Sequence, residues 1–326
     1  MDLIESYQEE LKLVRRTWTK VWVLALVAAA FLLPLYAPEH IVYLAAAAAF
    51  FGIGVLGQNL LIGYTGQISF GQAGFLCLGA FTYGHLARLG APWPLSLLAA
   101  GLVAGLFGLL VGFPSLRLKG PYLAIATMGF GIAVYQVFVN SPLLSGGRMG
   151  LTVQKLQPLF GLSQTNFYYY FNLLFCLGFI LLTYNIVSSY LGRAFIAIRD
   201  NDIAAEVLGV NLTRYKLLSF AISSFYVGVQ GGLMALFLGY LEPNMFTFFE
   251  TINFLVAVIV GGLASVEGAI MGAVFVVFVP QVFSAYKELV SVVFGIAIMI
   301  VLIFEPGGMA GRWIKMRLYF ANWPFR

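Results

Sequence analysis

Residues 192–216, with the sequence GRAFIAIRDNDIAAEVLGVNLTRYK, concentrate charge in a chain that otherwise carries little. The whole chain of 326 residues has only 18 Lys and Arg and 13 Asp and Glu. A polar segment between two apolar spans must face water, where its side chains can form ion pairs with a soluble partner. The seven charged residues of this segment are Arg193, Arg199, Asp200, Asp202, Glu206, Arg214 and Lys216.

The spacing within this segment predicts a short amphipathic helix. Small and apolar side chains share one side of a helical wheel and charged ones share another; the two sets are Ala194, Ile198, Ala205 and Leu208, and Arg199, Asp202 and Glu206. Gly209 is a natural helix stop, and Asn211 or Thr213 could cap the helix that follows. An ordinary solvated loop is the alternative interpretation.

A second polar stretch, GYTGQISFGQAG at residues 63–74, carries hydroxyls and amides but no charge. The chain has no Lys, Arg, Asp or Glu between Glu39 and Arg88, although two spans must meet there. An uncharged, glycine-rich junction predicts a broken or re-entrant segment, packed in protein or lining a cavity. Its polar side chains either line a translocation pathway or satisfy the backbone of the broken helix, and a tight loop between spans is a further alternative. They are Tyr64, Thr65, Gln67, Ser69 and Gln72.

The residue patterns of common catalytic and cofactor sites are missing from the sequence. There is no GxxxxGK[ST] phosphate loop, no HExxH, no CxxC and no EF-hand spacing. Ser69, His85 and Glu267 are too scattered to suggest an intramembrane enzyme. We therefore expect a transport function, with no cofactor and no metal bound by this chain.

Carboxylates within the apolar runs are also scarce. Glu250, Glu267 and Glu305 all fall near expected span ends. An ion-coupled carrier usually keeps an ionisable group in mid-membrane despite its cost. The pattern favours a passive conduit that is driven by another subunit.

Composition identifies an integral membrane protein. Hydrophobic residues make up 61% of the chain, charged residues 10%, and the mean hydropathy is +0.93, whereas soluble domains carry about a quarter charged residues. We predict an all-α polytopic bundle, a single transmembrane domain over residues 1–326. Candidate spans are 20–37, 41–62, 72–88, 93–113, 121–139, 167–190 and 215–240, with three shorter ones within 251–304. We prefer ten spans, with eight as the alternative.

The distribution of basic residues predicts the orientation. Clusters of Lys and Arg are typical of cytoplasmic loops, so we do not expect nucleic-acid binding. We place an N-terminal segment (1–20), the charged loop (192–214) and the tail (306–326) in the cytoplasm, and residues 140–166 on the outer face. The basic clusters are Lys12, Arg15, Arg16 and Lys20; Arg117 and Lys119; Arg193 and Arg199; and Arg312, Lys315 and Arg317.

Four blocks of sequence resemble a known family, the LivM-type permease subunits of ATP-binding-cassette (ABC) importers for branched-chain amino acids. They are GYTGQISFGQAGFLCLGAFTYG (63–84), RLKGPYLAIATMGFGIAVYQVFVNSPLLSGGRMGL (117–151), GRAFIAIRDNDIAAEVLGVNLTRYKLLSF (192–220) and VIVGGLASVEGAIMGAVF (258–275). The closing IFEPGGMAGR at 303–312 also fits. The third block is the most specific. The sequence departs from the family pattern at Ile132-Ala133, and at Glu267 and Ala269.

The resemblance implies a permease subunit in a bacterial or archaeal cytoplasmic (inner) membrane. Its partners would be a second related permease, two cytoplasmic ABC ATPases that use ATP and Mg, and an external solute-binding protein. Residues 193–209 would form the coupling helix that docks on an ATPase, with contacts from Arg193, Arg199, Asp200, Asp202, Glu206 and Gly209.

Two other functions stay open at this point. Urea and short-amide permeases of the same superfamily share much of the resemblance. An ATPase-independent channel or ion-coupled carrier is the alternative of another class.

Overall fold

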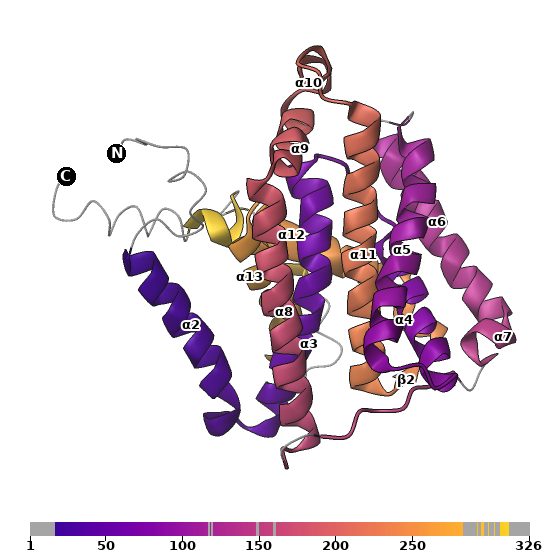
Figure 1. Ribbon diagram of the computed structural model, residues 1–326, viewed down its shortest axis with the longest axis vertical. Helices are drawn as coiled ribbons and strands as arrows, with labels where there is room; N and C mark the ends of the chain where they lie inside the picture. The colour runs from indigo at the N-terminus through magenta and orange to yellow at the C-terminus, as the bar shows by residue number, and fades with distance from the viewer. Residues whose placement is uncertain are drawn as a thin grey trace.

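Long apolar runs form the helices of a bundle in the computed structural model (Figure 1). It describes residues 17–116, 118, 120–147, 150–158 and 161–282, together with 292, 295, 296, 299, 303 and 307–312. The long helices are α2 (Thr17–Tyr36), α3 (Glu39–Asn59), α4 (Gln72–Arg88), α5 (Trp93–Ser115), α6 (Pro121–Asn140), α8 (Gln164–Ser188), α11 (Leu212–Leu238), α12 (Phe248–Gly261) and α13 (Val266–Val282). The short elements are η1 (Leu60–Tyr64), α7 (Pro142–Ser145), α9 (Tyr190–Asp200), α10 (Asp202–Val207), η3 (Pro243–Phe246) and the strands β1 (Leu151–Thr152) and β2 (Tyr240–Leu241).

The predicted helical membrane bundle is confirmed. Each of the seven spans predicted between residues 20 and 240 coincides with a helix. Five described helices are long and apolar enough to cross a membrane: Glu39–Tyr64, Trp93–Pro114, Pro121–Asn140, Gln164–Ser188 and Leu212–Leu238. Three apolar helices are shorter: Ala25–Tyr36, Phe248–Gly261 and Val266–Val282.

Several predictions fall outside the described residues. These include most of the segments 1–20 and 306–326, the basic residues Lys12, Arg15, Arg16, Arg117, Lys119, Lys315 and Arg317, and much of the third short span expected before residue 304. The count of ten spans therefore stays a prediction.

Helix α11 is the central helix, packed against α3, α4 and α5. Glycines allow the backbones to touch: a Cβ on Gly79 of α4 would lie 2.5 Å from the Gly228 Cα of α11. A Cβ on Gly272 of α13 would overlap the carbonyl oxygen of Ala257 in α12. Without a hydrophobic driving force between helices in lipid, such close approach is a main source of packing energy.

The two ends of the bundle differ (Figure 1). At one end α10 projects beyond the long helices. At the other, β1 and β2 pair antiparallel, Leu151 opposite Leu241, and tie the segment after α7 to the end of α11. The loops predicted to lie on opposite sides of the membrane, 192–214 and 140–166, thus occupy opposite ends of the molecule.

One buried amide joins α3 to the turn between α12 and α13. Asn59 Nδ2 donates to the Ser265 carbonyl oxygen at 2.7 Å, and its Oδ1 accepts from the Ala264 amide at 3.0 Å. Ala264 has a φ of 55°, an unusual conformation for a residue with a side chain. The side-chain amide of Asn59 therefore supplies hydrogen-bond partners for two backbone groups of this turn.

Candidate functional site

The helix that begins at Glu39 does not run directly into the next one. After Asn59 its last turn widens into the π-helix η1, and the chain then continues without regular structure to the start of α4 at Gln72. Gly66 takes a φ of 73°, which favours glycine. The prediction of a broken segment near residues 63–74 is confirmed.

The polar side chains of this broken segment are buried, and hydrogen bonds hold four of them. Gln67 Nε2 donates to Ser219 Oγ at 2.7 Å, and Thr65 Oγ1 donates to the Leu60 carbonyl oxygen at 2.9 Å. Gln72 donates to the amide of Gln58, which itself donates to the Ser69 carbonyl oxygen at 3.1 Å. Ser69 Oγ in turn accepts a bond from the Gly71 amide.

The bonds of Thr65 and Ser69 to backbone groups favour the backbone-supporting role for these two residues. Gln67 and Gln72 instead donate to the side chains of Ser219 and Gln58. Tyr64 is also buried. A pathway role for these five residues stays a prediction.

Backbone groups of the broken segment find partners on distant helices. The Phe70 amide donates to Thr127 Oγ1 on α6 at 2.9 Å, and the Ala73 amide donates to Thr251 Oγ1 on α12 at 3.0 Å. Gly71, the residue before α4, has no side chain to cap the helix, so Thr251 supplies the missing acceptor. Helices α6 and α12 are thereby connected to the start of α4.

The charged loop holds two helices where one was predicted. Helix α9 ends at Asp200 and α10 begins at Asp202, because Asn201 leaves the helical conformation, with φ −163° and ψ 110°, and accepts a bond from the Ala204 amide at 3.0 Å. This is the geometry of an N-cap. Gly209, with a φ of 87°, follows the end of α10, and Asn211 caps α11, as predicted.

The break changes which side chains are buried. Ala194, Ile198 and Ala205 are buried, as expected for one side of the segment. Leu208, which was expected to share that side, is 81% exposed. It follows α10 after the change of direction at Asn201, so a single helical wheel does not apply to it.

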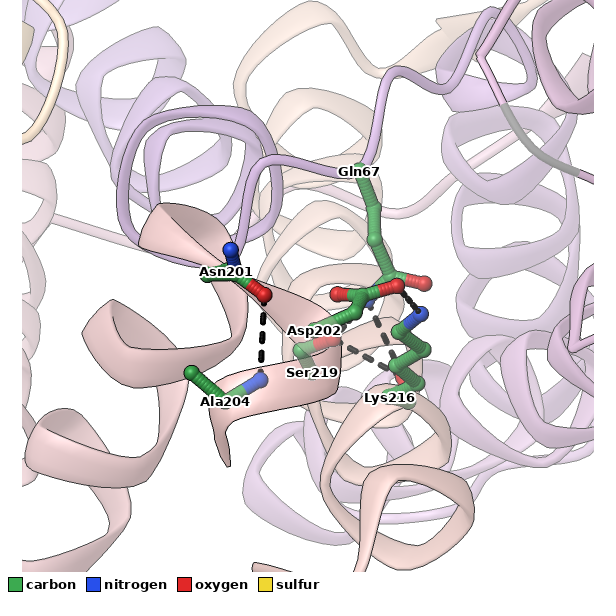
Figure 2. A network of polar contacts seen from close by, with 6 residues as sticks. All are labelled: Gln67, Asn201, Asp202, Ala204, Lys216 and Ser219. Carbon is green, nitrogen blue, oxygen red and sulfur yellow. Dashed lines mark hydrogen bonds and ion pairs between the residues drawn. The ribbon is translucent and has the colours of Figure 1, made fainter. Parts of the chain in front are cut away.

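An ion pair of Asp202 joins α10 to α11 (Figure 2). Lys216 Nζ donates to Asp202 Oδ2 at 2.6 Å, and the two side chains are 15% and 28% exposed. The backbone oxygen of Lys216 accepts from Ser219 Oγ at 2.8 Å, and Ser219 holds Gln67. The chain of contacts leads from α10 through α11 to the broken segment.

Arg199 makes a second, more direct connection. Its NH1 donates to the Gly63 carbonyl oxygen at 3.1 Å, and its Nε and NH2 donate to Asp200 Oδ1. Its side chain also lies over Gly66, where an added Cβ would be 3.1 Å from the Arg199 Cγ. Arg199 and Asp202 were predicted to contact a partner, and in this structure both contact the chain itself.

The remaining predicted coupling residues are open to solvent. Arg193 is exposed and donates to the Ser188 carbonyl oxygen at 3.3 Å, while Glu206 and Gly209 are exposed on and just after α10. Sequence reasoning missed two large apolar side chains beside them, Ile203 and Val207, which are exposed together with Leu208. Ile203 and Val207 are four residues apart, a spacing that places two side chains on one face of a helix. This spacing could have indicated an apolar face on α10.

Asp202→Asn is expected to loosen α10 by about 1 kcal/mol, because it removes the charge that holds Lys216 at a partly buried site. Backbone amides of α10 should then exchange hydrogen about fivefold faster, the ratio that this energy corresponds to. Asp200→Asn is the matched control, since Asp200 is 63% exposed. Equal exchange in the two variants would contradict the role given to Asp202.

Within the described residues, no group of three or more His, Cys, Asp or Glu side chains could hold a metal ion. Cys77 and Cys176 are buried free thiols.

Comparison with known families adds independent information. A family model described as "Branched-chain amino acid transport system / permease component" matches residues 40–302. No solved structure matches the chain.

Several named proteins are similar in sequence. The chain is 31% identical to a high-affinity branched-chain amino acid transport system permease protein, LivM of Salmonella typhimurium, over 89% of this chain and 74% of that protein. It is 28% identical to BraD of Pseudomonas aeruginosa, over 79% of this chain and 90% of that protein. LivH of Escherichia coli is 31% identical over 42% of this chain and 44% of its own length.

Proposed function

Because this chain belongs to the family of permease components of branched-chain amino acid transport systems, we propose that it is the membrane subunit of an ATP-driven importer for these amino acids. The observation that carries the proposal is the family match over residues 40–302, which includes the broken segment and the charged loop. The protein is a multi-pass membrane protein and a transport subunit, not an enzyme.

In this proposal the complex contains two cytoplasmic ATPases, which bind ATP and Mg, a second permease related to this chain, and an external solute-binding protein. The similarity to both LivM and LivH supports a pair of related permeases. The chain itself binds no cofactor. The membrane is the cytoplasmic (inner) membrane, with both termini and the α10 end in the cytoplasm, in accord with the basic loops.

Helices α9 and α10 would form the coupling element on an ATPase. The exposed Ile203, Val207 and Leu208 suit an apolar pocket on the partner, and Glu206 and Arg193 suit its polar rim. Arg199 and Asp202 would act inside the permease, by passing the movement of this element to the broken segment and to α11. Because Arg199 attaches this element to the broken segment and Asp202 attaches it to α11, a movement of the element would displace both.

Docking through the apolar side chains predicts a specific loss of partners. The double variant Val207→Asp/Leu208→Asp places two charges in a desolvated contact, so the ATPases should be lost, by at least about tenfold in yield, when the tagged protein is purified from its native host in detergent. Leu143→Asp is the matched control, because Leu143 is 93% exposed at the opposite end of the molecule. Mass identification of the co-eluting subunits is the measurement.

Two outcomes would contradict the proposed function. One is a wild-type chain that elutes without ATPases and transports in liposomes without nucleotide, as a channel or carrier would. The other is ATP-driven uptake into vesicles that urea inhibits and leucine does not.

A further inference from the structure

We propose that a pocket between α4, α6, η3 and α12 holds the apolar side chain of the amino acid as it passes through this subunit. The inference rests on the proposed function and adds to it a site for the substrate. None of the residues predicted from the sequence to form the pathway lines this pocket.

The pocket has a volume of about 210 Å³ and mostly apolar walls. Phe70, Phe246 and Phe248 supply aromatic faces, and Met128 and Ile132 of α6 supply aliphatic ones. An apolar cavity of about 150 Å³ is enough to bind benzene. The space is therefore suited to a branched aliphatic side chain, and it is too small for a drug-sized ligand.

The residues that line the pocket disfavour a ligand with a charged side chain and offer a few hydroxyl groups at its edge. It contains no Lys, Arg, Asp or Glu, so an ionised side chain would be desolvated there without a partner. Its hydroxyls come from Tyr135, Thr247 and Thr251. Tyr135 OH donates to Asn244 Oδ1 at 3.0 Å, which gives the pocket a polar edge beside η3. A few polar groups at the edge of an apolar pocket are typical of small-molecule sites.

The pocket is also connected to the coupling element. Phe70 and Ala73 belong to the same short stretch that Arg199 contacts at Gly63 and Gly66. Their amides are bonded to Thr127 of α6 and Thr251 of α12, so movement of the stretch alters the distance between the pocket walls. A site whose walls follow the driven element can release its ligand at a defined step of the cycle.

An acyl chain of a membrane lipid is the other possible occupant, because Ile132 at the pocket is 46% exposed. The experiment must therefore measure a response to the amino acid itself. Ile125 is a matched control position. It lies two helical turns away on α6, is 67% exposed and does not line the pocket.

The test uses the complete transporter in liposomes, supplied with ATP and the solute-binding protein. The Ile132→Cys and Ile125→Cys variants are treated with a small methanethiosulfonate reagent in the presence of leucine or glycine. The native Cys77 and Cys176 are buried and should react slowly. Leucine is expected to slow modification of Ile132→Cys at least about threefold relative to glycine, and to leave Ile125→Cys unchanged.

A second variant measures transport directly. Ile132→Trp should fill part of the pocket and lower leucine uptake severalfold, while Ile125→Trp should not. Wild-type complex that hydrolyses ATP but takes up no leucine would overturn the proposed function itself. Normal leucine uptake together with equal modification of Ile132→Cys in leucine and glycine would overturn only the assignment of the pocket to the amino acid.

Discussion

Gly79→Leu is expected to prevent α4 from docking on α11 and to give a protein that does not survive detergent extraction in folded form. At Gly79 the neighbours are the backbone atoms of Gly228, which cannot rotate away as a side chain can. Inserting methylenes into a packed core costs about 1–3 kcal/mol, and more where the backbone must move. We expect the cost here to exceed that range.

The measurement is the monodisperse fraction in size-exclusion chromatography after heating in detergent. Gly178→Leu is the control, because Gly178 is also within a long apolar helix, and a Cβ there would meet nothing within 4 Å. Wild-type behaviour of both variants would contradict the close approach of α4 and α11.

Asn59→Leu is expected to lower the free energy of unfolding by about 2–6 kcal/mol. Both side chains branch at Cγ, but leucine leaves the Ala264 amide and the Ser265 carbonyl without the partners they have in the structure. Each unsatisfied buried polar group costs about 1–3 kcal/mol. The turn between α12 and α13 should become mobile first, since these bonds hold Ala264 in its unusual conformation.

The effect can be followed by denaturant unfolding and by proteolysis between α12 and α13. Asn140→Leu makes the same chemical change on an exposed side chain that donates to the Gln136 carbonyl oxygen of its own helix, so its effect should stay within about 0.5 kcal/mol. A similar loss in both variants would mean that the bonds of Asn59 carry no special weight.

The sequence was sufficient to predict the seven helical runs between residues 20 and 240 and the broken segment. The spans follow from the length of the apolar runs. The broken segment was indicated by the absence of charge between Glu39 and Arg88, since a junction exposed to the cytoplasm usually carries a basic residue. The break at Asn201 was not foreseen. Asn201 lies in a polar run that is compatible with a continuous helix, whereas in the structure it caps α10, whose first residue pairs with Lys216 of α11.

The pocket and the bonds of Asn59 were beyond sequence reasoning for another reason. Asn59 and Ser265 are 206 residues apart, and the pocket joins residues of α4, α6 and α12. A single sequence shows which side chains can form hydrogen bonds, but not which distant groups become their partners. The departures from the family pattern illustrate this: Ile132 lines the pocket, and Glu267 accepts a bond from Tyr184 OH at 2.6 Å.

The long-range hydrogen bonds of the broken segment also constrain the order in which the chain can fold during synthesis and membrane insertion. Its partners Thr127, Ser219 and Thr251 are synthesised 57, 152 and 178 residues later than the groups they satisfy. Extended backbone cannot remain unpaired in hydrocarbon. A nascent chain that ends before α6 lacks the acceptor of the Phe70 amide, and one that ends before α12 lacks the acceptor of the Ala73 amide. We therefore expect this stretch to stay hydrated or held by the insertion machinery until α12 is made. Stalled or truncated chains should consequently be recognised by quality-control proteases at this segment.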